Sequence, residues 1–134
     1  MIHFEITSII ASVLAILMLP LTLQISTRRA ALGKAANNLT AVVFGYGGDE
    51  TLRRRIRALG NFIEYVPMCL IMLALLESSG ARESLLWSVG GLLVFGRFLH
   101  AYGMLYVTNP APRGIAMLMT YVSFLIPAVW LLLN

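Results

Sequence analysis

Three polar side chains are spaced so that they would share one face of a helix. Arg57, Asn61 and Glu64 stand at positions i, i+4 and i+7 in a largely apolar stretch, and such positions are neighbours on a helix surface. Polar groups in an apolar helix are costly and usually face the protein interior or a wet cavity. The spacing leaves two interpretations open: a binding site, or a polar stripe that holds helices together.

Two tyrosines and an arginine form a second set further along the chain. Tyr102 and Tyr106 are four residues apart and would share a helix face, while Arg113 follows Pro112 at the expected start of the last helix. A helix start offers free backbone N–H groups and a positive dipole end, so an arginine there favours an anion, including a thiolate. Each feature also has a structural explanation, because tyrosines form belts at membrane interfaces and arginines snorkel there.

Arg97 and Glu64 are the charged residues expected deepest in the helices. At 1.5 Å per residue, Arg97 lies about 15 Å and Glu64 about 9 Å from the same membrane surface. We expect them to neutralise each other, within one chain or across a subunit boundary. Cys69 has no adjacent base and is interpreted as packing. The sequence has no Cys/His cluster with zinc spacing, so we expect no metal.

The composition indicates that membrane helices carry these residues. The chain has 134 residues, of which 59% are hydrophobic and 12% charged, and its mean hydropathy is +0.83. Soluble domains are about half apolar and a quarter charged, and disordered chains are poor in apolar residues. One cysteine excludes a disulfide scaffold. The chain is therefore expected to be a small integral membrane protein with a single transmembrane domain over residues 1–134.

Four segments have the length and apolar character of membrane spans, and none alternates with the period of a barrel strand. The predicted spans are 6–27, 58–76, 84–107 and 114–134. The fold class is therefore all-α, an integral-membrane four-helix bundle. Most basic residues fall in the first loop, which extends over about 28–51, and at the start of the second span. This asymmetry places loops one and three in the cytosol and both termini on the non-cytosolic side. The net charge of +4 is thus a topology signal, and no nucleic-acid partner is expected.

These residues together resemble the membrane-associated proteins in eicosanoid and glutathione metabolism, the MAPEG superfamily. Residues 57–67 read RALGNFIEYVP and match the superfamily signature R-x-x-x-N-x-x-E-x-x-P. Residues 25–30 look like the end of the first helix in leukotriene-C synthase. Tyr102, Tyr106 and Arg113 match the spacing of the third-helix tyrosines and the thiolate-activating arginine of that enzyme. The similarity covers essentially the whole chain, and the loop around residues 45–49 looks like the bacterial branch.

The resemblance implies four-helix subunits that form a homotrimer, with glutathione bound between subunits near the cytosolic face. It assigns thiolate stabilisation to Arg113. It assigns glutathione binding to Arg28, Arg57, Asn61, Glu64, Tyr65, Tyr102 and Tyr106. The implied activity is that of a membrane-bound glutathione transferase, with glutathione peroxidase activity as a second reaction. The partners would be a lipophilic small-molecule electrophile or a lipid hydroperoxide and the membrane lipid, and the location a bacterial inner membrane.

Two departures and two alternatives qualify this resemblance. Leu59 replaces a polar residue that contacts glutathione in leukotriene-C synthase, and Gly114 stands where prostaglandin-E synthase has a catalytic serine, so prostaglandin isomerase chemistry is not expected. One alternative is a non-enzymatic membrane protein that binds lipid or a partner on the same scaffold. Arg113 argues against the role of the lipoxygenase-activating protein, which lacks this arginine, but a binding protein stays open as an alternative. The other is a small multidrug exporter, but such carriers hold an essential glutamate in the first span, where this chain has no charge.

Overall fold

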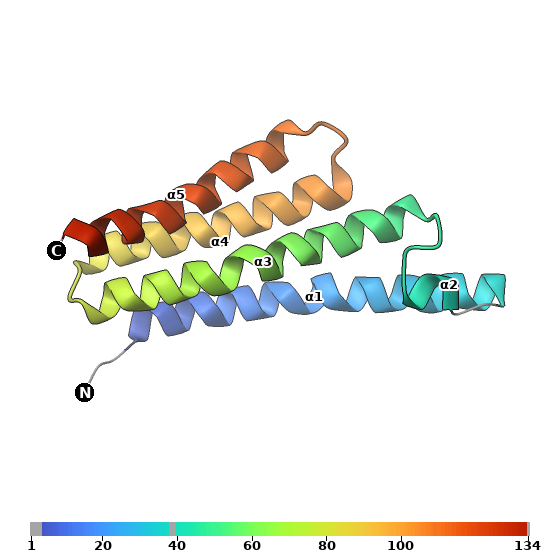
Figure 1. The fold of residues 1–134 in the computed structure, drawn as a ribbon, viewed down its shortest axis with the longest axis horizontal. Coiled ribbons are helices and arrows are strands. Elements are labelled where there is room, and N and C mark those ends of the chain that lie inside the picture. Colours follow the sequence, from blue (N-terminus) through green and yellow to red (C-terminus); the bar gives the residue numbers. More distant parts are fainter. Residues whose placement is uncertain (1–3, 38–39, 134) are drawn as a thin grey trace.

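The computed structural model describes residues 4–37 and 40–133, and its regular elements are all helices (Figure 1). They are α1 (Glu5–Ala36), α2 (Thr40–Val43), α3 (Glu50–Ser78), α4 (Glu83–Tyr106) and α5 (Ala111–Leu133). The long helices α1, α3, α4 and α5 are each long and apolar enough to cross a membrane. The prediction of an all-α protein with four membrane-length helices is confirmed.

The four long helices form a bundle with α3 and α4 at its centre. α1 and α5 each pack against both central helices. Consecutive long helices run in opposite directions, so both ends of the chain lie at the same end of the bundle (Figure 1). The α4–α5 loop and α2 lie at the opposite end. This end carries the arginines of α3 and Arg113 of α5, and we call it the arginine end.

The bundle is held together by close packing of aliphatic side chains and small residues. Leu14, Leu73 and Leu93 are completely or almost completely buried at the helix contacts. A Cβ atom at Gly90 would lie 2.7 Å from the side chain of Ile10, so glycine is what lets α4 approach α1 this closely. Large apolar side chains such as Ile16 cover the outer surface. This pattern suits a bundle in lipid, where packing rather than water exclusion holds helices together.

Two helices extend beyond the predicted membrane spans. α1 continues past residue 27 to Ala36, and α3 begins at Glu50 rather than near residue 58. Much of the predicted first loop, 28–51, is therefore helical. The sequence after residue 27 is rich in alanine, which favours helix even where basic residues exclude the chain from the bilayer. α1 ends at Asn37, which adopts a left-handed conformation (φ 47°) of the kind that terminates helices.

Glu77, near the end of α3, holds the first turn of α1. Its two carboxylate oxygens accept hydrogen bonds from the backbone N–H groups of Ile6 (2.9 Å) and Thr7 (2.8 Å). The first N–H groups of a helix have no partner within the helix, and the positive end of its dipole attracts an anion. Glu77 therefore fastens the two helices together at the end of the bundle opposite to the arginine end.

Replacing Glu77 with alanine is expected to destabilise the folded bundle by about 1–3 kcal/mol, because two part-buried N–H groups lose their charged acceptor. Thermal unfolding in detergent measures this change. Glu83→Ala is the matched control, since Glu83 is an exposed carboxylate in the first turn of α4 at the same end. Equal melting temperatures for the two variants would show that the Glu77 contacts do not stabilise the bundle.

Candidate functional site

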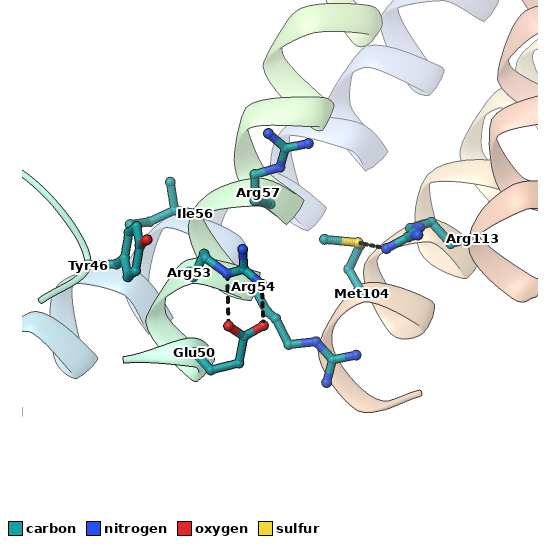
Figure 2. Close-up of a pocket in the computed structure, with 8 residues that line it drawn as sticks. All are labelled: Tyr46, Glu50, Arg53, Arg54, Ile56, Arg57, Met104 and Arg113. Carbon is teal, nitrogen blue, oxygen red and sulfur yellow. Dashed lines mark hydrogen bonds and ion pairs between the residues drawn. The ribbon is translucent and has the colours of Figure 1, made fainter. Parts of the chain in front are cut away.

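A cavity at the arginine end brings together two of the predicted site residues from different helices. It has a volume of about 690 Å³, and both Arg57 of α3 and Arg113 of α5 line it (Figure 2). We call it the arginine cavity. Its complete lining is Tyr46, Glu50, Arg53, Arg54, Ile56, Arg57, Met104 and Arg113.

The arginine cavity is strongly cationic, and its four arginines differ in how they are held. Arg53 forms an ion pair with Glu50, with N–O distances of 2.8 and 2.9 Å. Arg54 donates to the carbonyl oxygen of Val107 (2.7 Å) and so ties α3 to the end of α4. These two guanidinium groups are already engaged. The charge of Arg53 is offset by Glu50, whereas Arg54 adds to the positive charge of the cavity. Neither side chain offers all its donors to a ligand.

Arg57 and Arg113 keep most of their donors available. Both side chains are exposed. Arg113 reaches toward Met104 (Figure 2), where its Nη1 lies 3.5 Å from the thioether sulfur, a weak acceptor. Among residues 4–37 and 40–133, no hydrogen bond from the Arg57 guanidinium is recorded. Exposed guanidinium groups with weak or no internal partners are suited to bind carboxylate or thiolate groups.

The backbone of α4 sets the position of Arg113. A Cβ atom at Gly103 would lie 3.2 Å from the backbone nitrogen of Arg113 and 3.5 Å from Cβ of Pro112. Asn109 accepts a hydrogen bond from the backbone N–H of Ala111 (2.9 Å), which supports the start of α5. Arg113 therefore stands in the first turn of α5, as predicted, and is held close to α4 by a glycine contact.

The polar stripe of α3 divides between the surface and the interior. Glu64 is exposed like Arg57, whereas Asn61 is half-buried. The side-chain oxygen of Asn61 accepts a hydrogen bond from Nη1 of Arg97 (2.8 Å). Arg97, which is 1% exposed, also donates to the hydroxyl of Thr120. Within one chain, the expected pairing of Arg97 with Glu64 is therefore wrong, because neutral groups of α3 and α5 surround the guanidinium instead.

The predicted tyrosines lie away from the arginine cavity. Tyr65 packs against Tyr121 of α5, with ring centroids 5.9 Å apart. Tyr102 and Tyr106 pack on each other at 5.8 Å. They stand two residues on either side of Met104, about 200° around the helix from it, and so lie on the opposite face of α4. There they line a groove of about 240 Å³ against α1, which we call the tyrosine groove.

Arg28 is held by an ion pair at the start of α3. Its Nη2 and Nε donate to the two oxygens of Asp49 at 2.6 and 3.2 Å. Asp49 also accepts a hydrogen bond from the backbone N–H of Leu52 (2.6 Å) and so caps this helix. The hydrogen bond from the Arg28 guanidinium, supported by that from Leu52, holds the pKa of the Asp49 carboxyl below its usual range. Arg28 thus links the extension of α1 to the helix that carries Arg57.

Replacing Asp49 with asparagine keeps a cap and removes the charge pair, so the variant is expected to unfold at a lower temperature at pH 7. The lowered pKa of Asp49 means that this stabilisation exists above the usual carboxyl pKa of about 4. It is lost as the pH falls through the lower pKa of the folded state. The melting temperatures of wild type and Asp49→Asn should therefore converge in acid. A difference that stays constant down to pH 2 would contradict this account.

Some residues of this region were not found by sequence reasoning. Arg53 and Arg54 line the arginine cavity, but the sequence presents them only as part of a basic run that indicates topology. Met104 looked like apolar filler and contacts Arg113. Thr120 carries no sequence signal beyond being a polar residue in an apolar helix, yet it is fully buried against Arg97. Their partners are distant in sequence and depend on the register of α3, α4 and α5.

Comparison with known proteins decides the family. The model of the MAPEG family matches residues 7–133. The chain belongs to the MAPEG family. The superfamily predicted from the signature on α3 is therefore confirmed, and this MAPEG chain is a membrane protein with several spanning helices.

Curated relatives of this MAPEG chain occur in Escherichia coli. The inner membrane protein YecN of strain K12 is 36% identical over 62 residues, covering 46% of this chain and 47% of YecN. YecN of E. coli O6:H1 strain CFT073 matches with the same identity and coverage. The match thus spans about half the length of these relatives. No solved structure matches the chain at a significant level.

Proposed function

We propose that this MAPEG protein is a membrane-bound glutathione transferase that activates the thiolate of glutathione against a lipophilic electrophile. The observation that carries the proposal is the arginine cavity, which Arg57 of α3 and Arg113 of α5 both line. Glutathione has two carboxylates, one ammonium and one thiol. An exposed guanidinium at Arg57 suits a carboxylate, and the exposed Glu64, two turns further along α3, suits the ammonium. The half-buried Asn61 lies between them.

Arg113 would stabilise the thiolate. A free cysteine thiol has a pKa of about 8.5, so only a few per cent is ionised at neutral pH. Lowering this pKa by about two units requires roughly 2.7 kcal/mol of preferential stabilisation of the thiolate. One guanidinium at a few ångströms in a partly dry site can supply it. The start of α5 adds backbone N–H groups and a positive dipole end.

The thiolate would take part in two reactions. In conjugation, its sulfur forms a bond to an electrophilic carbon of the substrate, and the leaving group departs with the bonding electrons or a ring opens. In peroxide reduction, two glutathione molecules supply two electrons and two protons. The hydroperoxide becomes an alcohol and water, and the glutathione molecules become the disulfide. Both substrates would enter from the bilayer, which concentrates apolar compounds next to the exposed apolar surface.

The remaining predicted residues support a site shared between copies of the chain in a homotrimer. Tyr102 and Tyr106 line the tyrosine groove on the face of α4 opposite to Met104, so one ligand at Arg113 does not reach the tyrosines of the same chain. A second copy could present its own pair. Glu64 also stays exposed within the predicted second span, where uncovered charge is costly. Arg28 would act through its ion pair with Asp49.

The proposed location is the inner membrane of a bacterium, since the relative YecN is named an inner membrane protein. The concentration of basic residues at the arginine end favours a cytosolic position for this end, with both termini on the other side. Glutathione is a water-soluble tripeptide of the cytosol. A cytosolic arginine end would therefore place the cavity within its reach.

Two measurements on the detergent-purified protein test the proposal. Calorimetric titration with glutathione measures binding. Product analysis with a lipophilic aryl halide and an alkyl hydroperoxide then measures turnover. We expect saturable binding and a glutathione conjugate or an alcohol. Binding without turnover of any electrophile would favour a non-enzymatic protein on the same scaffold. Absence of binding would overturn the proposal.

A further inference from the structure

Arg97 is a buried cation whose surroundings contain no acidic partner in the described part of the chain. The ion pairs recorded there are Arg28–Asp49 and Arg53–Glu50. The guanidinium is instead held by neutral acceptors on two helices, namely the amide oxygen of Asn61 on α3 and the hydroxyl and thioether of α5 residues Thr120 and Met117. Burying a cation without an anion is expensive. Such an arrangement calls for a role beyond helix packing.

The contact with Arg97 fixes which end of the Asn61 amide points inward. A guanidinium group has five donors and no acceptor, so only the side-chain oxygen of Asn61 can face it. The observed bond of 2.8 Å joins Nη1 of Arg97 to this oxygen. The Asn61 amide nitrogen, which has two donors, must then point away from Arg97. Asn61 is half-buried, and its amide nitrogen is not among the buried side-chain atoms that lack a partner. We therefore expect this nitrogen to reach the surface next to Arg57 and Glu64.

Thr120 prevents Arg97 from turning away from Asn61. The Thr120 hydroxyl donates its single proton to the carbonyl oxygen of Ala116 (3.0 Å). Its oxygen is therefore left to accept from Nη2 of Arg97. A planar guanidinium fastened at Nη2 by α5 keeps its Nη1 directed at α3. The series of hydrogen bonds Ala116–Thr120–Arg97–Asn61 thus runs from the interior of the bundle to the polar stripe of α3.

We infer that Arg97 is a positioning residue that locks the Asn61 amide so that it donates to the bound ligand. The ligand group opposite Asn61 must then be an acceptor, a carboxylate or carbonyl oxygen, and not an ammonium. This inference rests on the proposed function, because it takes glutathione as the ligand of the α3 stripe. It goes beyond that function by assigning a direction to one hydrogen bond and a role to a residue that does not touch the ligand.

Two substitutions at Asn61, compared by their effect on glutathione binding, test the inference. Asn61→Asp keeps the shape of the side chain and gives Arg97 a carboxylate partner, but it presents an acceptor to the ligand instead of a donor. Asn61→Ala removes the donor without adding an acceptor. Losing one such hydrogen bond weakens binding by about fivefold. The dissociation constant for glutathione, measured by calorimetry, should therefore rise about fivefold in Asn61→Ala and more than tenfold in Asn61→Asp.

Variants of Arg97 distinguish a role in orienting the Asn61 amide from a role in helix packing. Arg97→Lys retains a donor-only cation and should bind glutathione within a few-fold of wild type. Arg97→Gln can offer either a donor or an acceptor, so it releases the Asn61 amide, and binding should weaken about fivefold. Size-exclusion profiles and melting temperatures identify any variant that does not fold, and the comparison at Asn61 stands without the Arg97 variants.

The outcomes distinguish this inference from the proposed function. Glutathione binding that is as tight or tighter in Asn61→Asp than in wild type would show that the amide oxygen faces the ligand. That result would overturn the inference and leave the proposed function intact. Unchanged binding in both Asn61 variants would remove Asn61 from the site and also overturn the inference. A wild-type protein that does not bind glutathione would overturn the proposed function and the inference together.

Discussion

Replacing Arg113 with alanine should lower the thiolate content of bound glutathione at pH 6.5 by about 50-fold. The reason is that the thiol pKa would return from about 6.5 to about 8.5 when the guanidinium is removed. Ultraviolet absorption of the thiolate, measured on saturated protein, reports this change directly. Binding itself should weaken less, since Arg57 and the α3 stripe remain in place.

Arg113→Ala should lower the rate of conjugation less than it lowers the thiolate content. A more basic thiolate is intrinsically more nucleophilic, with a Brønsted coefficient of about 0.4–0.5, so part of the lost ionisation is offset. Conjugation at pH 6.5 should therefore fall by about 5- to 10-fold, and the difference should vanish or reverse above pH 9. Arg82→Ala is the matched control, because Arg82 is an exposed arginine in the α3–α4 turn at the other end of the bundle. A pH profile that does not move in Arg113→Ala would refute the thiolate assignment.

Replacing Arg57 with methionine should weaken glutathione binding by about 10- to 100-fold, because a hydrogen bond to a charged group contributes about 1.5–3 kcal/mol. The kinetic pKa of the thiol should stay where it is in wild type, since Arg113 is unchanged. Calorimetry and the pH profile of conjugation measure the two quantities separately. Arg57→Met should therefore lower the affinity for glutathione and leave the thiol pKa unchanged. Arg113→Ala should mainly raise the thiol pKa.

The control for Arg57 is again at the far end of the bundle. Arg82→Met removes one exposed arginine and should leave the affinity for glutathione at its wild-type value. Added salt should weaken binding in wild type more than in Arg57→Met, because the variant has lost one charged contact that ions can screen. Equal affinity in Arg57→Met and wild type would remove Arg57 from the site and, with it, the main support for a ligand in the arginine cavity.

The sequence was sufficient for the helices and the family because these depend on local pattern. Apolar segments of membrane length, two of them with a single charge, predicted the four long helices, and the signature on α3 predicted the MAPEG family. Asp49 was recognisable as a cap because its role needs only the residues that follow it. Helix ends were harder. Hydropathy locates where a chain leaves the bilayer, but α1 continues as a helix in water to Ala36.

Contacts between helices could not be predicted from the sequence. Arg97 and Glu64 have opposite charges and are both expected within the membrane spans, which suggested a pair. Helix rotation decides otherwise, since Arg97 turns inward to Asn61 and Thr120 while Glu64 faces outward. Likewise, Tyr102 and Met104 are two residues apart in sequence and face opposite sides of α4. Only the packing of α4 between its neighbours determines which of them meets Arg113.

A glutathione transferase of the proposed kind must bind glutathione and ionise its thiol. An ultraviolet difference spectrum tests binding and ionisation in one titration. It is recorded on the detergent-purified wild-type protein as glutathione is added at neutral pH. We expect a thiolate band that grows with glutathione, saturates and is lost in Arg113→Ala. No band, together with no heat of binding, would contradict the claim and direct attention to lipids or partner proteins as ligands of the same bundle.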